Sequence, residues 1–300
     1  MKKYLLVAAL IISSLQADDP LPSWKSGKVK QALLDFINNT TDKKSPKYIP
    51  EAERIATFDQ DGTLWVEHPV YTQLQYCLDH AKSKSSQEQD LEKLAMQTSS
   101  GMSVAQFQKD VSSWLATAKH PRWQRPYTEL TYLPMQELLT YFRASGYKTY
   151  IVTGGGQDFV RVYSDKVYGI PPEQVIGTAI STKFTYDTSG KPYLLKEPNL
   201  LLNDNYAGKP EGIHMMIGRR PKASFGNSTG DKEMLEYVDG LALIVLHDDA
   251  EREYAYGPAQ NLPDTEIGTF TQELYNEAKA KGWLIVSMKS DWKKIFSFEE

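Results

Sequence analysis

Two aspartates one residue apart are the residues most able to do chemistry. Asp59 and Asp61 directly follow the apolar run 54–58, and Gly62 opens a turn behind them. At this spacing both carboxylates lie on one face of an extended chain, where a cation relieves their repulsion. Mg²⁺ takes oxygen ligands and prefers one or two carboxylates plus phosphate oxygens. The pair therefore indicates a magnesium site with a carboxylate nucleophile and a carboxyl proton donor, and a chance Asp-X-Asp loop is the alternative.

A hydroxyl and three glycines follow a second apolar run. Thr153 and Gly154-Gly155-Gly156 come directly after 148–152, and a helical pattern begins behind them. A hydroxyl beside exposed amides at a helix N-terminus suits a phosphate oxygen, although glycine is also common in ordinary turns. The spacing Gly-X-Gly-X-X-Gly is absent from this segment, which disfavours a dinucleotide-binding fold.

Two later segments add a cation and further oxygen donors. Lys209 opens a helical stretch, where the helix dipole disfavours it unless it has an anionic partner; a solvated surface lysine is the alternative. The run 222–225 leads into a loop that carries Asn227 and Asp231. Amide and carboxylate oxygens suit Mg²⁺, and Asp231 also has the position of a helix cap.

These residues need a scaffold that brings distant segments together. Strand-like runs alternate with helical patterns, which predicts an α/β fold with a Rossmann-like parallel sheet flanked by helices. The strand-like runs span 54–58, 148–152, 175–178, 222–225 and 242–247, with an additional edge strand at 283–288. The run 188–190 is a hairpin signal to which we assign no chemistry. Ligands bind at the carboxyl edge of such sheets, so the candidate residues are expected there.

The interval between the first two predicted strands is unusually long. It contains amphipathic helical patterns over 71–84, 90–98 and 104–118, far more than a crossover connection needs. We interpret it as a helical cap that excludes water and selects substrates. The predicted organisation is therefore a signal peptide over 1–17, an α/β core over 18–64 and 128–300, and a cap over 65–127.

The N-terminal segment predicts export. Lys2 and Lys3 precede the apolar run 4–12, and small or polar residues lead to a cleavage site after Ala17. The run is too short to span a bilayer, so we expect a periplasmic or secreted protein without stable membrane insertion, and a tethered form is the alternative. Cleavage removes two lysines and changes the net charge from −4 to −6. With no Lys/Arg-rich block, small solutes rather than nucleic acid are the expected partners.

Taken in order, the four segments resemble the haloacid dehalogenase (HAD) superfamily of aspartate-nucleophile phosphatases, over most of residues 50–250. The resemblance implies that Asp59 becomes an aspartyl phosphate and that Asp61 is the general acid and then the general base. It implies that Thr153, the Gly154 amide and Lys209 hold the phosphoryl group. Mg²⁺ is then bound by Asp59, the backbone carbonyl of Asp61 and the pair Asn227/Asp231, of which the sequence does not say which is the direct ligand.

Cap position and leaving-group chemistry refine this resemblance. A cap directly after the first motif is similar to the phosphoserine-phosphatase and phosphorylcholine-phosphatase branches. Asp61 favours a phosphoric monoester hydrolase over a dehalogenase, because an alkoxide leaving group needs a proton and a halide does not. A phosphotransferase or mutase, or a noncatalytic periplasmic binding protein, are the alternatives. Substrate and oligomeric state are not determined by the sequence.

Three details of the sequence add narrower hypotheses. Asn227 stands where many relatives carry Asp, which predicts weaker Mg²⁺ binding and tighter binding when Asp is restored. The acids that follow 242–247, including Asp248, are interpreted as part of a structural loop or of a pocket wall, because they come one strand later than the metal loop. Glu67 and one or two aromatic side chains of the cap are hypothesised to line the pocket and hold a quaternary ammonium group. The candidate aromatics are Trp65, Tyr71, Tyr76, Trp114, Trp123 and Tyr127.

Overall fold

The structure, a computed structural model, describes residues 19–80 and 98–300. The predicted signal peptide at 1–17 and the part of the predicted helix at 90–98 that precedes Thr98 lie outside these residues. Within them, no helix is both long and apolar enough to cross a membrane.

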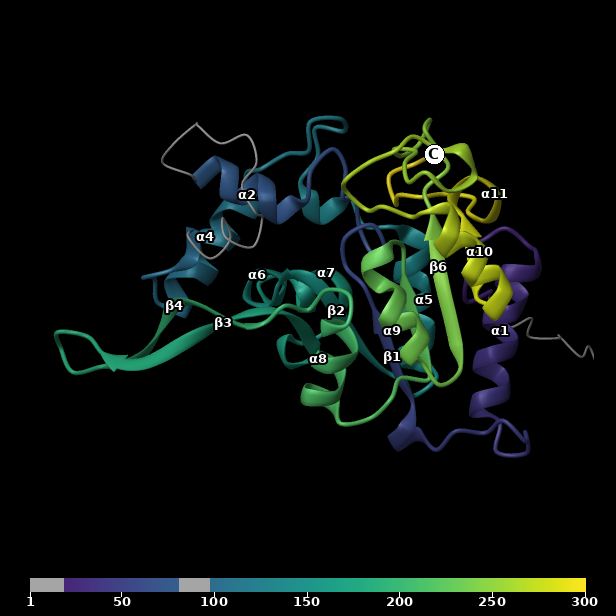
Figure 1. Ribbon diagram of the computed structural model, residues 1–300, viewed down its shortest axis with the longest axis horizontal. Helices are drawn as coiled ribbons and strands as arrows, with labels where there is room; N and C mark the ends of the chain where they lie inside the picture. The colour runs from purple at the N-terminus through teal and green to yellow at the C-terminus, as the bar shows by residue number, and fades with distance from the viewer. Residues whose placement is uncertain (1–18, 81–97) are drawn as a thin grey trace, which may run out of the picture.

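One seven-stranded sheet, in the order β4-β3-β2-β1-β5-β6-β7, organises the molecule (Figure 1). All neighbouring strands are parallel except β3 and β4, so the predicted α/β fold is confirmed. The strands are β1 (Ile55–Phe58), β2 (Lys148–Gly156), β3 (Val175–Tyr186), β4 (Pro192–Leu202), β5 (Ala223–Gly226), β6 (Leu241–Leu246) and β7 (Leu284–Ser287). Every predicted strand is present, and the predicted hairpin is the longer β3–β4 hairpin.

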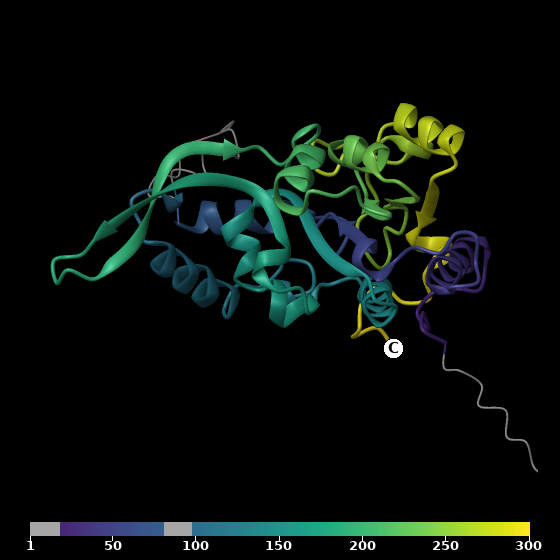
Figure 2. The ribbon, with the colours of Figure 1, turned by 90° about the horizontal axis from the view of Figure 1, so that it is seen from below.

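Helices cover both faces of the sheet (Figure 2). They are α1 (Lys28–Thr41), α2 (Thr72–His80), α4 (Val104–Leu115), α5 (Leu133–Ala144), α6 (Gln157–Arg161), α7 (Ser164–Tyr168), α8 (Gly208–Ile217), α9 (Lys232–Tyr237), α10 (Gln272–Lys281) and α11 (Met288–Asp291). The single helix predicted over 157–167 is wrong, because the chain breaks it into α6 and α7. Three of the described helices begin with a side-chain cap, α4, α10 and α11; at the start of α4 the hydroxyl of Ser103 accepts from the Gln106 amide.

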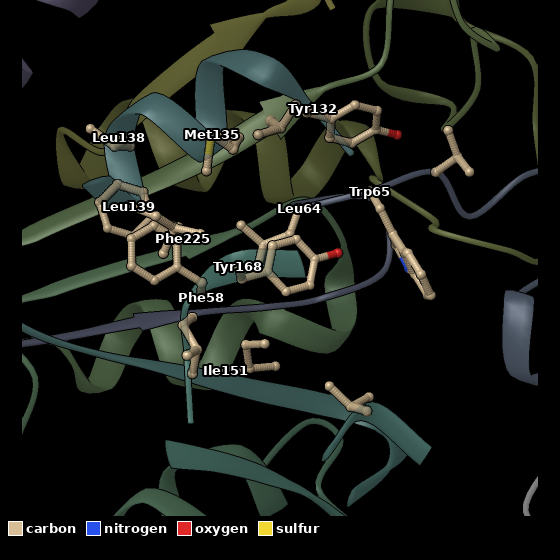
Figure 3. Packing of buried hydrophobic residues seen from close by; sticks show 14 of the residues in the cluster. Phe58, Leu64, Trp65, Tyr132, Met135, Leu138, Leu139, Ile151, Tyr168 and Phe225 are labelled. Carbon is tan, nitrogen blue, oxygen red and sulfur yellow. The ribbon is translucent and has the colours of Figure 1, made fainter. Parts of the chain in front are cut away.

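The core explains why the central strands are apolar on both faces. On one face, Phe58 of β1 stacks on Phe225 of β5 at 4.3 Å, and Leu138 and Leu139 of α5 lie close to them (Figure 3). On the opposite face a smaller cluster packs around Val152 under α8. A strand buried on both sides reads as a continuous apolar run, as β1 and β6 do.

The interval 65–127 contributes α2 and α4, which lie beside the β3–β4 hairpin, away from the centre of the sheet (Figure 1). Two backbone hydrogen bonds of 2.9 Å join the hairpin to the segment before α4, from the Gly101 amide to the Lys196 carbonyl and from the Lys196 amide to the Met102 carbonyl. The hairpin and these helices therefore form one wall above the sheet edge. The division into core and cap at 65 and 127 stays a prediction.

Candidate active site

The candidate residues meet at the carboxyl ends of the three central strands. Asp59 follows β1, Thr153 lies in β2, and Asn227 follows β5. Because β1 lies between β2 and β5, these three side chains come from adjacent strand ends. The Asp59 amide donates to the Phe225 carbonyl at 2.9 Å, which continues the β1–β5 pairing up to the first aspartate. The sheet therefore holds Asp59 on rigid backbone.

Lys209, in the first turn of α8, reaches back to this edge. Its Nζ donates to Asp59 Oδ1 and to Asp231 Oδ1, each at 2.6 Å, and to the Val152 carbonyl at 2.9 Å. Only 2% of the lysine is exposed. The carboxylates of Asp231 and Asp59 outweigh the effect of burial and hold the pKa of Lys209 above its ordinary value. Lys209 is therefore a fixed cation against the candidate nucleophile.

Burial sets the proton affinity of both motif aspartates. It raises the pKa of Asp61 to about 6, and together with the neighbouring Asp231 it raises the pKa of Asp59 to about 8. The pKa of Asp61 is raised by burial alone, whereas the pKa of Asp59 is raised by burial and by repulsion from Asp231, which Lys209 only partly offsets. A carboxyl that binds its proton more tightly than usual is suited to donate it to a leaving group near neutral pH.

Trp65 takes a different position from the one hypothesised. Its Nε1 donates to Asp61 Oδ1 at 2.7 Å, and its ring stacks on Tyr163 at 4.8 Å. The side chain is buried and does not line the cavity. Trp65 is therefore not one of the aromatics that line the pocket, and it instead orients the carboxyl of Asp61. Of the candidate aromatics, Tyr71 lines the cavity together with Glu67, and a hold on a quaternary ammonium group stays a hypothesis.

The glycine segment forms the second side of the site. Thr153 Oγ1 accepts from the Gly155 amide at 3.0 Å, and Thr153 and Gly154 both line the cavity. The Gly156 amide donates to Oε1 of Gln73, on α2, at 2.6 Å. Sequence reasoning missed Gln73, since nothing in its local pattern distinguishes it from other polar residues on an amphipathic helix.

The loop after β5 separates the roles of Asn227 and Asp231. Oδ2 of Asp231 accepts from the amides of Asn227 and Ser228, at 2.9 and 3.0 Å, while its Oδ1 accepts from Lys209. Asp231 therefore caps the loop and binds the lysine at the same time. The Asn227 side chain instead accepts from Thr63 Oγ1 at 3.1 Å and donates to Glu67 Oε1 at 2.7 Å.

The donor set at this edge fits Mg²⁺. The second carboxylate oxygen of Asp59 accepts no hydrogen bond from the described residues, and the Asp61 carbonyl and Asn227 Oδ1 are further hard oxygen donors. Among the described residues, no group of three His, Cys, Asp or Glu side chains is placed to hold a metal ion. A metal here therefore needs amide and backbone oxygens beside the carboxylate.

A cavity of about 640 Å³ opens above these residues. Asp59, Asp61, Thr153, Lys209 and Asp231 line one part of it, whereas Asn227 does not. The rest of its wall comes from the helices and the hairpin, and includes Glu67, Tyr71, Gln73, Phe107, Asp158, Leu194 and Lys196. Lys196 pairs with Asp158 and lies over the Phe107 ring, 4.9 Å from its centroid. The hairpin, to which the sequence assigned no chemistry, therefore builds part of the pocket.

No family model matches the sequence, and no curated protein matches it. Some solved structures are similar. A protein of unknown function from Bordetella pertussis Tohama I has 15% identity over 78% of this chain and 98% of its own, with a TM-score of 0.49. A HAD family hydrolase from Salmonella enterica subsp. enterica serovar Typhi has 18% identity over 66% and 64%, with a TM-score of 0.38.

A phosphoserine phosphohydrolase-like protein from Francisella tularensis subsp. tularensis SCHU S4 has 15% identity over 65% of this chain and 88% of its own, with a TM-score of 0.38. Identities this low bear on the fold alone, and one fold hosts many activities. What the site can do therefore follows from its own geometry: a carboxylate held by a buried ammonium, a second carboxyl beside it, and hydroxyl and amide donors facing the same cavity.

Proposed function

We propose that this protein is a Mg²⁺-dependent phosphatase that hydrolyses phosphate monoesters through an aspartyl phosphate on Asp59. The observation that carries the proposal is the placement of Lys209 Nζ, 2.6 Å from both Asp59 and Asp231, at the base of a cavity that Thr153 and Gly154 also line. A nucleophilic carboxylate needs a cation that offsets the charge of the incoming phosphoryl group, and Lys209 provides it.

The proposed reaction has two steps. An Asp59 carboxylate oxygen bonds to phosphorus while the phosphorus–oxygen bond to the leaving group breaks, and Asp61 gives its proton to that oxygen. Water then attacks the aspartyl phosphate, Asp61 takes the water proton, and inorganic phosphate and free Asp59 result. Thr153, Gly154 and Lys209 hold the phosphoryl oxygens. Asp59, the Asp61 carbonyl and Asn227 would hold Mg²⁺, which would supply further positive charge against these oxygens.

Phosphate release from a panel of monoesters tests the proposal directly. We expect turnover of p-nitrophenyl phosphate, phosphoserine or phosphorylcholine with Mg²⁺, and its loss in excess chelator, because without the cation the buried acids are neutralised by protons. Readdition of Mg²⁺ should restore the rate. Equal turnover with and without chelator would contradict the metal dependence. Transfer of phosphate to an added alcohol in preference to water would favour the phosphotransferase.

The size of the cavity supports a substrate larger than a short-chain ester. Pockets of several hundred Å³ accommodate ligands of drug size, and the part distant from Asp59 offers the apolar ring of Phe107 beside the paired Lys196 and Asp158. We therefore propose that the leaving group has an apolar portion that packs on Phe107. Phosphoserine and phosphorylcholine are smaller and more polar than this, and they are the alternative substrates in the monoester panel.

Phe107→Ala tests the role of this distant wall. We expect KM for p-nitrophenyl or naphthyl phosphate to rise about ten-fold, the cost of losing roughly 1.4 kcal/mol of apolar contact, with little change for a short-chain ester. Phe184→Ala is the control: Phe184 lies on the exposed part of the β3–β4 hairpin and does not line the cavity. Equal effects on large and small esters would exclude this subsite.

We also propose that the protein is exported, to the periplasm or beyond. The proposal rests on Lys2, Lys3, the short apolar run 4–12 and the small residues before Ala17. N-terminal sequencing of the protein recovered from a cell fractionation tests it. A mature chain that starts near residue 18 supports cleavage, and an intact Met1 in the soluble cytoplasmic fraction contradicts it.

A further inference from the structure

We propose that Glu67 is a positioning residue of the magnesium site, which supplies through Asn227 the negative charge that an aspartate would carry at position 227. The inference rests on the proposed function, because it concerns the same metal site. It goes beyond it in giving a role to a buried carboxylate for which the reaction itself has no use. Its basis is the geometry of four side chains, described in turn below.

The Asn227 amide has both of its ends assigned by its neighbours. Nδ2 donates to Glu67 Oε1 at 2.7 Å, and Oδ1 accepts from Thr63 Oγ1 at 3.1 Å. A carboxylate only accepts, so the NH₂ group must face Glu67, and the amide oxygen is turned toward Thr63, two residues after Asp61. Asparagine is thus the residue that both donates to Glu67 and offers an oxygen to a metal.

Glu67 lies in a space built to its shape. A β-carbon at Gly62 would lie 2.4 Å from Glu67 Oε1, and one at Gly268 would lie 1.8 Å from it. Both glycines have positive φ, 71° and 66°, which favours glycine at these positions. Tyr256 donates its hydroxyl to the same oxygen at 2.9 Å, and only 2% of Glu67 is exposed. The nearby Gly62 turn and two distant segments, at Tyr256 and Gly268, therefore fix this carboxylate beside Asn227.

The arrangement resembles a ligand supported by a carboxylate behind it. In such pairs the supporting carboxylate orients the ligand and increases its electron donation, and its loss typically costs about 10–100-fold in metal affinity. Here it also makes up a charge: Asn227 is neutral, and the Glu67 carboxylate, which lines the cavity, lies one hydrogen bond from it. Weak metal binding by a neutral ligand, expected from the sequence, is thereby offset.

Calorimetric titration of metal-free protein with Mg²⁺ tests the inference without an activity assay. We expect Glu67→Gln to weaken Mg²⁺ binding about 10–100-fold, because it removes the charge, although the glutamine oxygen can still accept from Asn227 and Tyr256. The double variant Glu67→Gln/Asn227→Asp exchanges donor and acceptor and restores one negative charge to the pair. We expect its Mg²⁺ affinity to return to within about three-fold of wild type or better.

Tyr256→Phe is the matched control for packing. It removes the other hydrogen bond to Glu67 but no charge, so we expect a lower melting temperature and Mg²⁺ affinity within about three-fold of wild type. Wild-type Mg²⁺ affinity in Glu67→Gln would overturn the inference. If that variant does not fold, the double variant decides: a folded double variant with near-wild-type affinity supports the exchange, and one that binds more than ten-fold more weakly overturns it.

Phosphate release, measured separately, distinguishes this inference from the proposed function. Weaker Mg²⁺ binding by Glu67→Gln, in a protein whose wild type binds Mg²⁺ but hydrolyses no ester, supports the role of Glu67 and overturns the phosphatase proposal. An active, Mg²⁺-dependent wild type together with unchanged metal affinity in Glu67→Gln supports the phosphatase proposal and overturns the role of Glu67. Failure of the wild type to bind Mg²⁺ overturns the role of Glu67.

Discussion

Asp59→Asn is expected to reduce phosphate release by at least about 10⁴-fold, the scale on which removing a covalent nucleophile acts. An amide does not attack phosphorus, and no second carboxylate replaces it: Asp231 is held by Lys209 and by loop amides, and Asp61 is oriented by Trp65. The fold should survive, because Lys209 keeps Asp231 and the Val152 carbonyl as partners. Rapid-quench detection of a phosphorylated protein, present in wild type and absent in the variant, checks the intermediate.

Asp248→Asn is the matched control for this prediction. Asp248 also follows a strand of the same sheet, yet it accepts from Ser287 and Lys289 and does not line the cavity. We expect its rate to stay within about two-fold of wild type. A large loss in Asp248→Asn, or residual wild-type turnover in Asp59→Asn, would mean that the acids after β6 rather than those after β1 form the reactive centre.

Lys209→Met is expected to have two separate effects. Removing a cation from the developing charge should lower kcat by about 10²–10³-fold. It also leaves Asp59 and Asp231 buried without their shared partner, and breaking a buried ion pair costs about 3–5 kcal/mol of unfolding free energy. Denaturant unfolding in chelator measures the second effect. Because a bound divalent cation also offsets buried negative charge, Mg²⁺ should raise the stability of this variant more than that of wild type.

Lys222→Met provides the comparison for an ordinary ion pair. Lys222 bonds to Asp239 at 2.7 Å, but Asp239 is mostly exposed, and such pairs contribute about 0–1 kcal/mol. We expect unchanged kcat and a small change in stability. If Lys209→Met behaved in the same way, Lys209 would be a structural lysine, and the proposed hold on the phosphoryl group would be wrong.

The proposed catalytic and substrate-selecting roles belong to two different parts of the cavity, the sheet edge and the outer wall. The reacting groups lie on the central strands and on the first turn of α8, whereas Gln73, Phe107 and Lys196 come from the helices and hairpin that form the outer wall. The core beneath the sheet edge fixes the positions of the reacting groups. The residues of the outer wall contact the leaving group and therefore select it. Substitutions in the wall should therefore change KM and ester preference more than kcat.

Local pattern was sufficient for much of the fold. The runs that end in Asp59, Thr153 and Gly226 form adjacent strands, because the buried part of each run is mostly apolar. The buried hydroxyls of Thr57 in β1 and Ser224 in β5 bond to each other at 2.7 Å. The pairing of Lys209 with the motif also agrees with the expectation that a lysine at a helix start has an anionic partner. The break between α6 and α7 was not visible in the periodicity.

The hydrogen-bond partners within the site could not be predicted from the sequence, because they depend on contacts between segments far apart in the chain. Glu67 bonds to Asn227, 160 residues away in the chain, and to Tyr256, 189 residues away. Trp65 was a candidate for lining the pocket, but in the structure its Nε1 donates to Asp61. The sequence by itself determined where the strands end and which polar residues lie in the loops behind them, since strand and turn preferences act over a few neighbouring residues. Which oxygen faces which donor was decided only by tertiary packing, because burial forces each polar group to take the partner that the surrounding segments leave within reach.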